Sequence, residues 1–69
     1  MKATTKQVGG SHYKDFAIQP TEFCQRNRLN TCEANVVKYV CRHNAKGQRQ
    51  DIEKAMHYLE LLLEFEYGE

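Results

Sequence analysis

The sequence has 69 residues, a formal net charge of +1, three cysteines and no tryptophan, and its length excludes more than one domain. At this size folding buries only about 60% of the chain's surface, so a lone monomer is marginally stable and we expect self-association to complete the core. Residues 1–50 carry nine lysines and arginines against three acids, and residues 51–69 carry one lysine against six acids, a segregation that suits an anion site or head-to-tail pairing.

The N-terminal sequence predicts a flexible tail, a glycine hinge and a short extended segment before the first helix. Residues 1–8 are polar and aperiodic, and the glycine pair that follows permits backbone angles that other residues avoid. We therefore expect a flexible tail followed by a single helical domain over residues 9–69. Before the first helix, Phe16 and Ile18 alternate with polar neighbours, which predicts a short extended stretch laid on the core.

The first two helices are predicted from their start signals. The first begins at Pro20, because proline's fixed φ and missing donor are tolerated in a first turn, and it ends near residues 27–28. Asn30 is followed three residues later by Glu33, a capping-box pattern that predicts the start of the second helix. We expect this second helix to run to about residue 44.

The third helix is predicted from about residue 50 to residue 66. Gly47 is expected to form a left-handed C-cap for the second helix, and the turn over residues 46–49 leads into the third. The reversal makes the second and third helices an antiparallel hairpin. The expected fold class is all-α, with a short N-terminal extended segment and three helices in an oligomer.

Two stripes of side chains share the third helix. The stripe that we expect to face the core has 3,4 spacing. Its members are Ile52, Ala55, Met56, Leu59, Leu62 and Leu63. The members of a second, flanking stripe are Asp51, Lys54, Tyr58, Leu61 and Phe65. A monomer of this size cannot cover both, so we interpret Leu61, Phe65 and Tyr67 as a self-association surface. The alternative is that the first helix and the N-terminal segment cover them.

The second helix has an apolar arc and a polar arc at about 100° per residue. The expected core arc consists of Val36, Val37, Val40 and Cys41. The opposite arc consists of Asn35, Lys38, Tyr39, Arg42 and, if the helix reaches it, Lys46. Lys38 and Arg42 lie one turn apart and can bind two oxygens of one phosphate, while Asn35 and Tyr39 can contact a base or sugar edge. Two cations on a helix are also common surface decoration.

Three N-terminal residues complete the candidate site. His12, Tyr13 and Lys14 supply a titratable ring, a phenol and a cation directly after the glycine hinge, from which they can close over a ligand. The alternative is that Tyr13 anchors the tail to the core while the other two face water. The predicted catalytic residues are His12 and Arg42. The predicted ligand-binding residues are Tyr13, Lys14, Asn35, Lys38, Tyr39 and Lys46.

Other chemistries are disfavoured by motif and spacing. The chain has no phosphate loop and no G-x-G-x-x-G fingerprint. Zinc is the rival interpretation of three cysteines and three histidines, but no C-x-x-C pair exists, and Cys41 and His43 would lie about 200° apart on a helix. No residue pairing identifies a base for a cysteine nucleophile. The paired acidic clusters of MazG-type, magnesium-dependent pyrophosphohydrolases are also missing. We expect no metal site, and no cofactor is firmly implied.

The cysteine count and the hydropathy pattern predict a cellular location. An odd number of cysteines in helical patterns does not describe a secreted disulfide framework, so we expect reduced thiols. No N-terminal apolar stretch resembles a signal peptide, and no apolar run approaches the ~20 residues of a membrane span. These features predict a soluble, cytoplasmic protein without a membrane partner.

Four segments resemble a known family. They are Gly9-Gly10-Ser11-His12-Tyr13, Ile18-Gln19-Pro20-x-Glu22-Phe23, Asn35-Val36-Val37-Lys38-Tyr39-Val40-x-Arg42 and Lys46-Gly47-x-x-x-Asp51-Ile52-x-Lys54-Ala55-x-x-Tyr58-Leu59. Over about residues 9–63 the chain is similar to the SaV-like proteins, small tailed-phage proteins catalogued as a domain of unknown function. The resemblance implies a location in the infected host cell, and polar site residues at His12, Tyr13, Lys14, Asn35, Lys38, Tyr39, Arg42, Lys46 and Asp51.

The resemblance also bears on activity and partners. A related domain occurs in a podophage early protein described as a nucleoside monophosphate kinase without a phosphate loop, which acts on deoxynucleotides such as dTMP and dGMP. That relative is longer, so a 69-residue chain would have to assemble two nucleotide sites between subunits. Other relatives are linked to sensitivity towards a host abortive-infection system, which implies a host protein as a possible partner.

Three hypotheses follow from these observations. The first is an oligomeric nucleotide-binding protein, with possible phosphotransferase activity in which Lys38 and Arg42 stabilise phosphate charge and His12 assists proton transfer. The second is a binding module without catalysis, either a sponge or sensor for a nucleotide signal or an adaptor for a host defence protein. The third, nucleic-acid binding through Lys38, Arg42, Lys46 and Arg49, is the weakest, because the net charge is near zero and the second helix shows no extended basic stripe with aromatic platforms.

Overall fold

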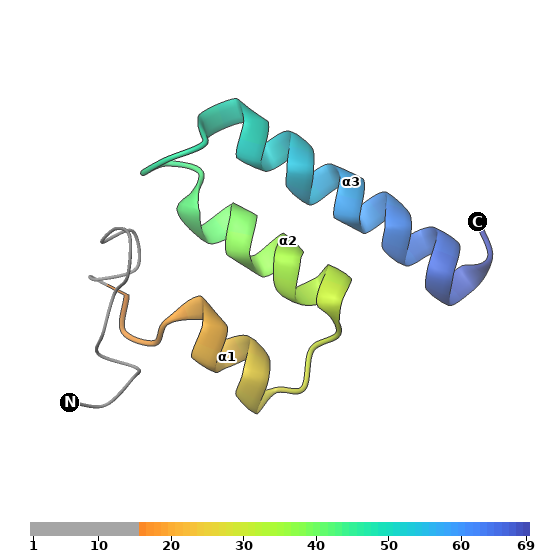
Figure 1. Ribbon diagram of the computed structural model, residues 1–69, viewed down its shortest axis with the longest axis horizontal. Helices are drawn as coiled ribbons and strands as arrows, with labels where there is room; N and C mark the ends of the chain where they lie inside the picture. Colours follow the sequence, from red (N-terminus) through yellow and green to blue (C-terminus); the bar gives the residue numbers. More distant parts are fainter. Residues whose placement is uncertain (1–15) are drawn as a thin grey trace.

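The computed structural model describes residues 16–69, and this part of the chain forms three α-helices and no β-strand. The helices are α1 (Pro20–Arg26), α2 (Thr31–Arg42) and α3 (Gln48–Tyr67). Figure 1 shows them side by side, with α2 between α1 and α3. The all-α class predicted from the sequence is therefore confirmed for the described residues. The predicted tail and hinge lie outside them.

Helix α1 begins as predicted and is followed, two residues after its end, by a left-handed residue. Pro20 occupies the first turn, and Pro20 and Cys24 are its buried residues. At its C-terminus the Arg28 N–H donates to the Gln25 carbonyl (3.2 Å) and the Leu29 N–H donates to the Cys24 carbonyl (3.0 Å). These two bonds form a Schellman motif, and Arg28 takes the left-handed position in it with φ of 56°.

The left-handed backbone at Arg28 predicts a stabilising substitution. Arg28→Gly is expected to raise the free energy of unfolding by about 0.5–1 kcal/mol, because glycine adopts positive φ without the Cβ penalty. Urea denaturation followed by circular dichroism measures the change. Arg26→Gly, which also removes a cation but lies inside α1, is expected to lower stability. An Arg28→Gly variant less stable than the parent would contradict the interpretation.

Helix α2 begins with the predicted capping box. The Asn30 side chain accepts from the Glu33 N–H (2.9 Å), and the Glu33 carboxylate accepts from the Asn30 N–H (2.9 Å). The Asn30 side-chain amide also donates to the Glu66 carboxylate (3.4 Å). The first turn of α2 is thereby tied to the last turns of α3, which packs closely along α2.

The turn between α2 and α3 differs from the prediction at Gly47. The glycine has φ of −85° and is not left-handed; the left-handed residue is Gln48, with φ of 54°. Gly47 is required for a different reason, since a Cβ built there would overlap the Asp51 carboxylate. Close approach of a side chain, and not backbone freedom, explains the glycine.

Helix α3 is rotated relative to the predicted core stripe. Of that stripe only Ala55 is buried, Leu62 is half-buried, and the other members, Ile52, Met56, Leu59 and Leu63, are exposed. The flanking stripe faces α2 instead, with Asp51 buried and Lys54, Tyr58 and Leu61 half-buried. Phe65 and Tyr67, predicted to mediate self-association, are exposed at 66% and 74%.

The predicted apolar arc of α2 is only partly buried. Val40 is 49% exposed, and Val36, Val37 and Cys41 are only half-buried. Phe16 and Ile18, expected to lie on the core, are exposed as well. The polar arc is drawn towards α3, because Arg42 on that arc pairs with Asp51 on α3.

Within residues 16–69, no helix combines the length and the apolar character that crossing a membrane requires.

Candidate anion-binding site

A buried ion pair joins the end of α2 to the start of α3. Arg42 Nε donates to Asp51 Oδ2 (3.0 Å) and Arg42 Nη2 donates to Asp51 Oδ1 (3.2 Å). The Gly47 N–H donates to Oδ2 as well (3.0 Å). The Asp51 side chain is 1% exposed and that of Arg42 is 15% exposed. This bidentate geometry is the strongest that arginine forms with a carboxylate.

The surroundings of Asp51 favour its ionised form. The hydrogen bonds from Arg42 hold the pKa of Asp51 below its ordinary value of 3.8, and the charge of Arg42 and the Gly47 N–H act in the same direction. Burial acts in the opposite direction but does not prevail. The positive charge of Arg42 is therefore compensated within the protein, which bears directly on its predicted role as a phosphate ligand.

The ring of Tyr39 is the centre of a cationic cluster. Lys38 Nζ lies 5.1 Å, Arg42 Cζ 4.7 Å and Lys54 Nζ 5.3 Å from the ring centroid. On α3, the Tyr58 ring stacks with it at a centroid distance of 6.0 Å and an interplanar angle of 16°. Such cation–ring contacts are attractive, so Tyr39 holds three positive groups near one aromatic surface.

Two of these three cations, Lys38 and Lys54, form no ion pair within the described part of the chain, although the charge of Lys54 helps to lower the pKa of Asp51. Ion pairs there join Arg26 to Glu22, Arg42 to Asp51 and Arg49 to Glu53. Neither Lys38 nor Lys54 forms an ion pair with an acid of residues 16–69. Both ammonium groups lie within 5.3 Å of one ring centroid, so positive charge from α2 and α3 gathers around this ring.

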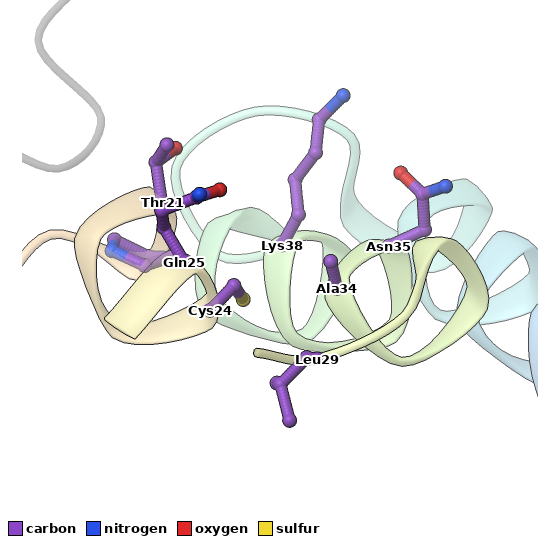
Figure 2. A pocket seen from close by; sticks show the side chains of 8 residues that line it. Thr21, Cys24, Gln25, Leu29, Ala34, Asn35 and Lys38 are labelled. Carbon is purple, nitrogen blue, oxygen red and sulfur yellow. The ribbon is translucent and has the colours of Figure 1, made fainter. Parts of the chain in front are cut away.

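A surface hollow lies between α1 and α2 beside Lys38. Its volume is about 210 Å³, and it is lined by Pro20, Thr21, Cys24, Gln25, Leu29, Ala34, Asn35 and Lys38. Figure 2 shows the side chains of Lys38 and Asn35 rising from α2 on the same side as that of Thr21, whereas Leu29 points the opposite way. The hollow therefore combines an apolar floor with a rim that carries a cation and an amide.

A second groove lies along α3. Its volume is about 450 Å³, and it is lined by Tyr39, Gln50, Glu53, Lys54, His57 and Tyr58. The His57 ring lies 6.0 Å from that of Tyr58 at 57°. The groove therefore presents the rings of Tyr39, His57 and Tyr58, and Lys38, which lines the hollow between α1 and α2, lies 5.1 Å from the Tyr39 ring centroid.

The structure brings together four of the predicted site residues. Asn35 and Lys38 share the hollow, and Lys38, Tyr39 and Arg42 share the ring cluster. Lys46 is exposed in the turn after α2 and belongs to neither group. The three N-terminal candidates, His12, Tyr13 and Lys14, lie outside the described residues. The catalytic roles of His12 and Arg42 stay predictions.

Sequence reasoning missed three residues of this site, namely Lys54, His57 and Tyr58. Lys54 and Tyr58 are four residues apart and share a face of α3, which was a detectable signal. That signal acquires meaning only when this face is known to pack against Tyr39 of α2.

The thiols and acids of the described residues do not suggest other chemistry. Cys24, Cys32 and Cys41 are free, and burial together with the nearby Cys24 raises the pKa of the Cys41 thiol. A raised thiol pKa is the opposite of what a cysteine nucleophile requires. Across residues 16–69 no three histidine, cysteine or acidic side chains gather in a group that could hold a metal ion.

Comparison with known proteins identifies a family without a known function. A family model described as a protein of unknown function, DUF3310, matches residues 7–60. No curated protein and no solved structure matches the chain. Nothing in this match links the chain to the SaV-like phage proteins or to a nucleotide kinase domain, so those resemblances stay predictions.

Proposed function

The chain belongs to the DUF3310 family, whose function is unknown, and from this starting point we propose that it binds a nucleotide or another phosphate-bearing small molecule. The site extends over α2 and α3, which form an antiparallel hairpin in this proposal. The observation that carries it is the pair Lys38 and Lys54, whose ammonium groups lie 5.1 and 5.3 Å from the Tyr39 ring centroid and form no ion pair within residues 16–69.

The phosphate-binding part of the proposal rests on charge and geometry. Lys38 and Lys54 come from different helices, so they can approach a phosphate group from two directions and neutralise its charge together. Asn35, on the rim of the hollow beside Lys38, can donate to a further oxygen or to a sugar hydroxyl. The base has a place in the groove beside the Tyr58 and His57 rings, where stacking tolerates any base.

A more specific proposal concerns the origin of the protein and its activity. By resemblance to SaV-like proteins, this is a phage-encoded oligomer of the infected cell's cytoplasm, with an activity like that of a nucleoside monophosphate kinase. Transfer would move the terminal phosphoryl group of ATP to dTMP and give ADP and dTDP. Lys38 would stabilise the transferred charge, and His12 would accept the proton of the attacking phosphate group.

One observation favours the second candidate, a binding module without catalysis that acts on a nucleotide signal or a host protein. The guanidinium of Arg42, which we predicted to contact the transferred phosphate, places Nε and Nη2 on the Asp51 carboxylate. Its supported role is to position Tyr39 and the turn before α3. A site whose two lysines form no ion pair can bind an anion without possessing the full set of groups for transfer.

A nucleotide panel tests binding. At a ligand concentration a hundred times its dissociation constant, binding stabilises the folded state by about 2.7 kcal/mol, which a thermal shift detects. Lys38→Gln and Lys54→Gln are each expected to weaken the affinity for the best nucleotide about tenfold, because each removes one charge-assisted contact. Arg26→Gln, a neutralisation on α1 outside the cluster, is expected to leave affinity unchanged.

The same variants separate binding from catalysis. Phosphate transfer from ATP to dTMP, measured as dTDP formation with and without Mg²⁺, would support the kinase-like activity if Lys38→Gln abolished it. Nucleotide binding without transfer would support the binding module. If no mono-, di- or triphosphate shifts the melting temperature, or if Arg26→Gln weakens binding as much as Lys38→Gln does, the proposed site is refuted.

A further inference from the structure

An apolar strip runs along the side of α3 that faces away from α2. Its four residues are Ile52, Met56, Leu59 and Leu63, which are 36%, 58%, 48% and 48% exposed. The spacing of 4, 3 and 4 places them on one face of the helix. This is the spacing with which one helix presents interlocking side chains to another.

The described helices bury very little apolar material without a partner for this strip. Their buried apolar residues are Pro20, Cys24, Cys32 and Ala55, all small, and the most buried side chain is that of Asp51. Burial of large apolar side chains is the main favourable term in folding. The four large side chains of the strip are about half exposed, so a substantial part of the free energy that their burial could contribute to folding is not gained in the monomer.

We propose that a second copy of this chain covers the strip, with the two α3 helices antiparallel and related by a twofold axis. In this register Ile52 lies opposite the partner's Leu63, and Met56 lies opposite the partner's Leu59. The twofold axis repeats each contact, so the strip is complementary to itself. The proposal does not rest on the nucleotide site, because Lys38 and Lys54 lie outside the strip.

The distribution of charge favours a second copy of this chain as the partner, and it favours the antiparallel direction. Residues 38–56, which include the start of α3, contain five lysines and arginines against two acids; residues 57–69, at its other end, contain four glutamates and no lysine or arginine. Antiparallel pairing places each acidic end beside the partner's basic end. Parallel pairing would place the two glutamate-rich ends together, at a cost in repulsion.

Sedimentation equilibrium over a range of concentrations tests the interface. The wild-type chain is expected to sediment at twice its 8.1 kDa mass. Met56→Glu is expected to weaken dimerisation about a hundredfold or more, since the twofold axis places the buried charge in the interface twice. Phe65→Glu is the matched control, because Phe65 is also exposed on α3 but lies off the strip, and it is expected to leave the dimer intact.

Charge exchange tests the direction. Arg49→Glu is expected to weaken the dimer, and combining it with Glu64→Lys is expected to restore it. Failure of the double variant to recover would overturn the antiparallel arrangement. A wild-type monomer at all concentrations, or dissociation by Phe65→Glu but not by Met56→Glu, would overturn the interface itself.

A measurement on the wild-type chain guards against a variant that simply fails to fold. Amide hydrogen exchange of residues 52–63 is expected to slow as protein concentration rises, whereas exchange in α1 is expected to change less. Exchange in the strip that is independent of concentration would show that the face is covered from within the chain or remains bare. Either outcome refutes the dimer.

Discussion

Asp51→Asn is expected to leave an appreciable fraction of the protein unfolded at 25 °C. The substitution removes the negative charge that compensates Arg42, whose side chain is only 15% exposed, and it puts an amide donor among the donors of Arg42 and Gly47. Breaking a buried pair by removing one partner is among the most destabilising single changes. A chain stabilised by roughly 0.05–0.15 kcal/mol per residue has little stability to lose. Far-ultraviolet circular dichroism in urea measures the loss.

Two comparisons show whether the stability lost in Asp51→Asn comes from the ion pair between Arg42 and Asp51. The double variant Arg42→Met, Asp51→Asn is expected to be more stable than the two single effects predict, because the uncompensated charge has gone. Glu22→Gln breaks the exposed pair with Arg26 (3.2 Å) and is expected to cost less than about 1 kcal/mol. If Asp51→Asn is as mild as Glu22→Gln, the pair does not hold the two helices together.

The pH dependence of stability has a definite sign. The pKa of Asp51 is lowered in the folded state, chiefly by the Arg42 hydrogen bonds, so at acidic pH the unfolded chain binds the proton more readily than the folded one. Stability from this group is complete above the ordinary value of 3.8 and disappears as the pH falls through the lowered folded value. In Asp51→Asn this part of the acid transition is expected to be absent.

Gly47→Ala is the second substitution with a large expected effect. The backbone at Gly47 has φ of −85°, which alanine adopts readily, so backbone strain predicts no loss. The new methyl group would instead overlap the Asp51 carboxylate and displace it from the Gly47 N–H and from Arg42. Inserting a methyl group into a filled site costs about 1–3 kcal/mol, which should appear as a lower urea midpoint.

The loss of stability in Gly47→Ala should depend on the Asp51 carboxylate, which the new methyl group would overlap. In an Asp51→Ala background the methyl group has room, so adding Gly47→Ala is expected to cost little more. Gly68→Ala provides a contrast, since nothing lies within 4 Å of that position but its φ is +72°, and only a backbone penalty is expected. An unchanged cost of Gly47→Ala in the Asp51→Ala background would contradict the steric explanation.

The local signals for the helices were predictive because each acts over a few residues. Pro20 begins α1, and the Asn30 and Glu33 capping box begins α2, as expected from their positions in the sequence. The end of α2 was less predictable. A glycine after a helix typically forms a left-handed cap. At position 47, however, glycine is needed because the Asp51 carboxylate leaves no room for a Cβ atom.

The candidate site was predictable only on the α2 side. Helical spacing correctly grouped Lys38, Tyr39 and Arg42, because residues three and four apart are neighbours on a helix. Lys54 and Tyr58 on α3 could not be added from spacing, since two stripes of that helix were each long enough to face a neighbour. The choice between the stripes is a property of the packed pair of helices.

By itself, the sequence determined the three helices, the start of α1 at Pro20, the capping box of α2 and the grouping of polar side chains on α2, because propensity, capping and helical period act locally. The tertiary structure alone decided which side of α3 faces inward. The bidentate contact between Arg42 and Asp51 brings together residues on different helices, and a buried charge must find its partner. That requirement turns the polar stripe of α3 towards α2, places Lys54 beside Tyr39, and leaves the strip from Ile52 to Leu63 exposed.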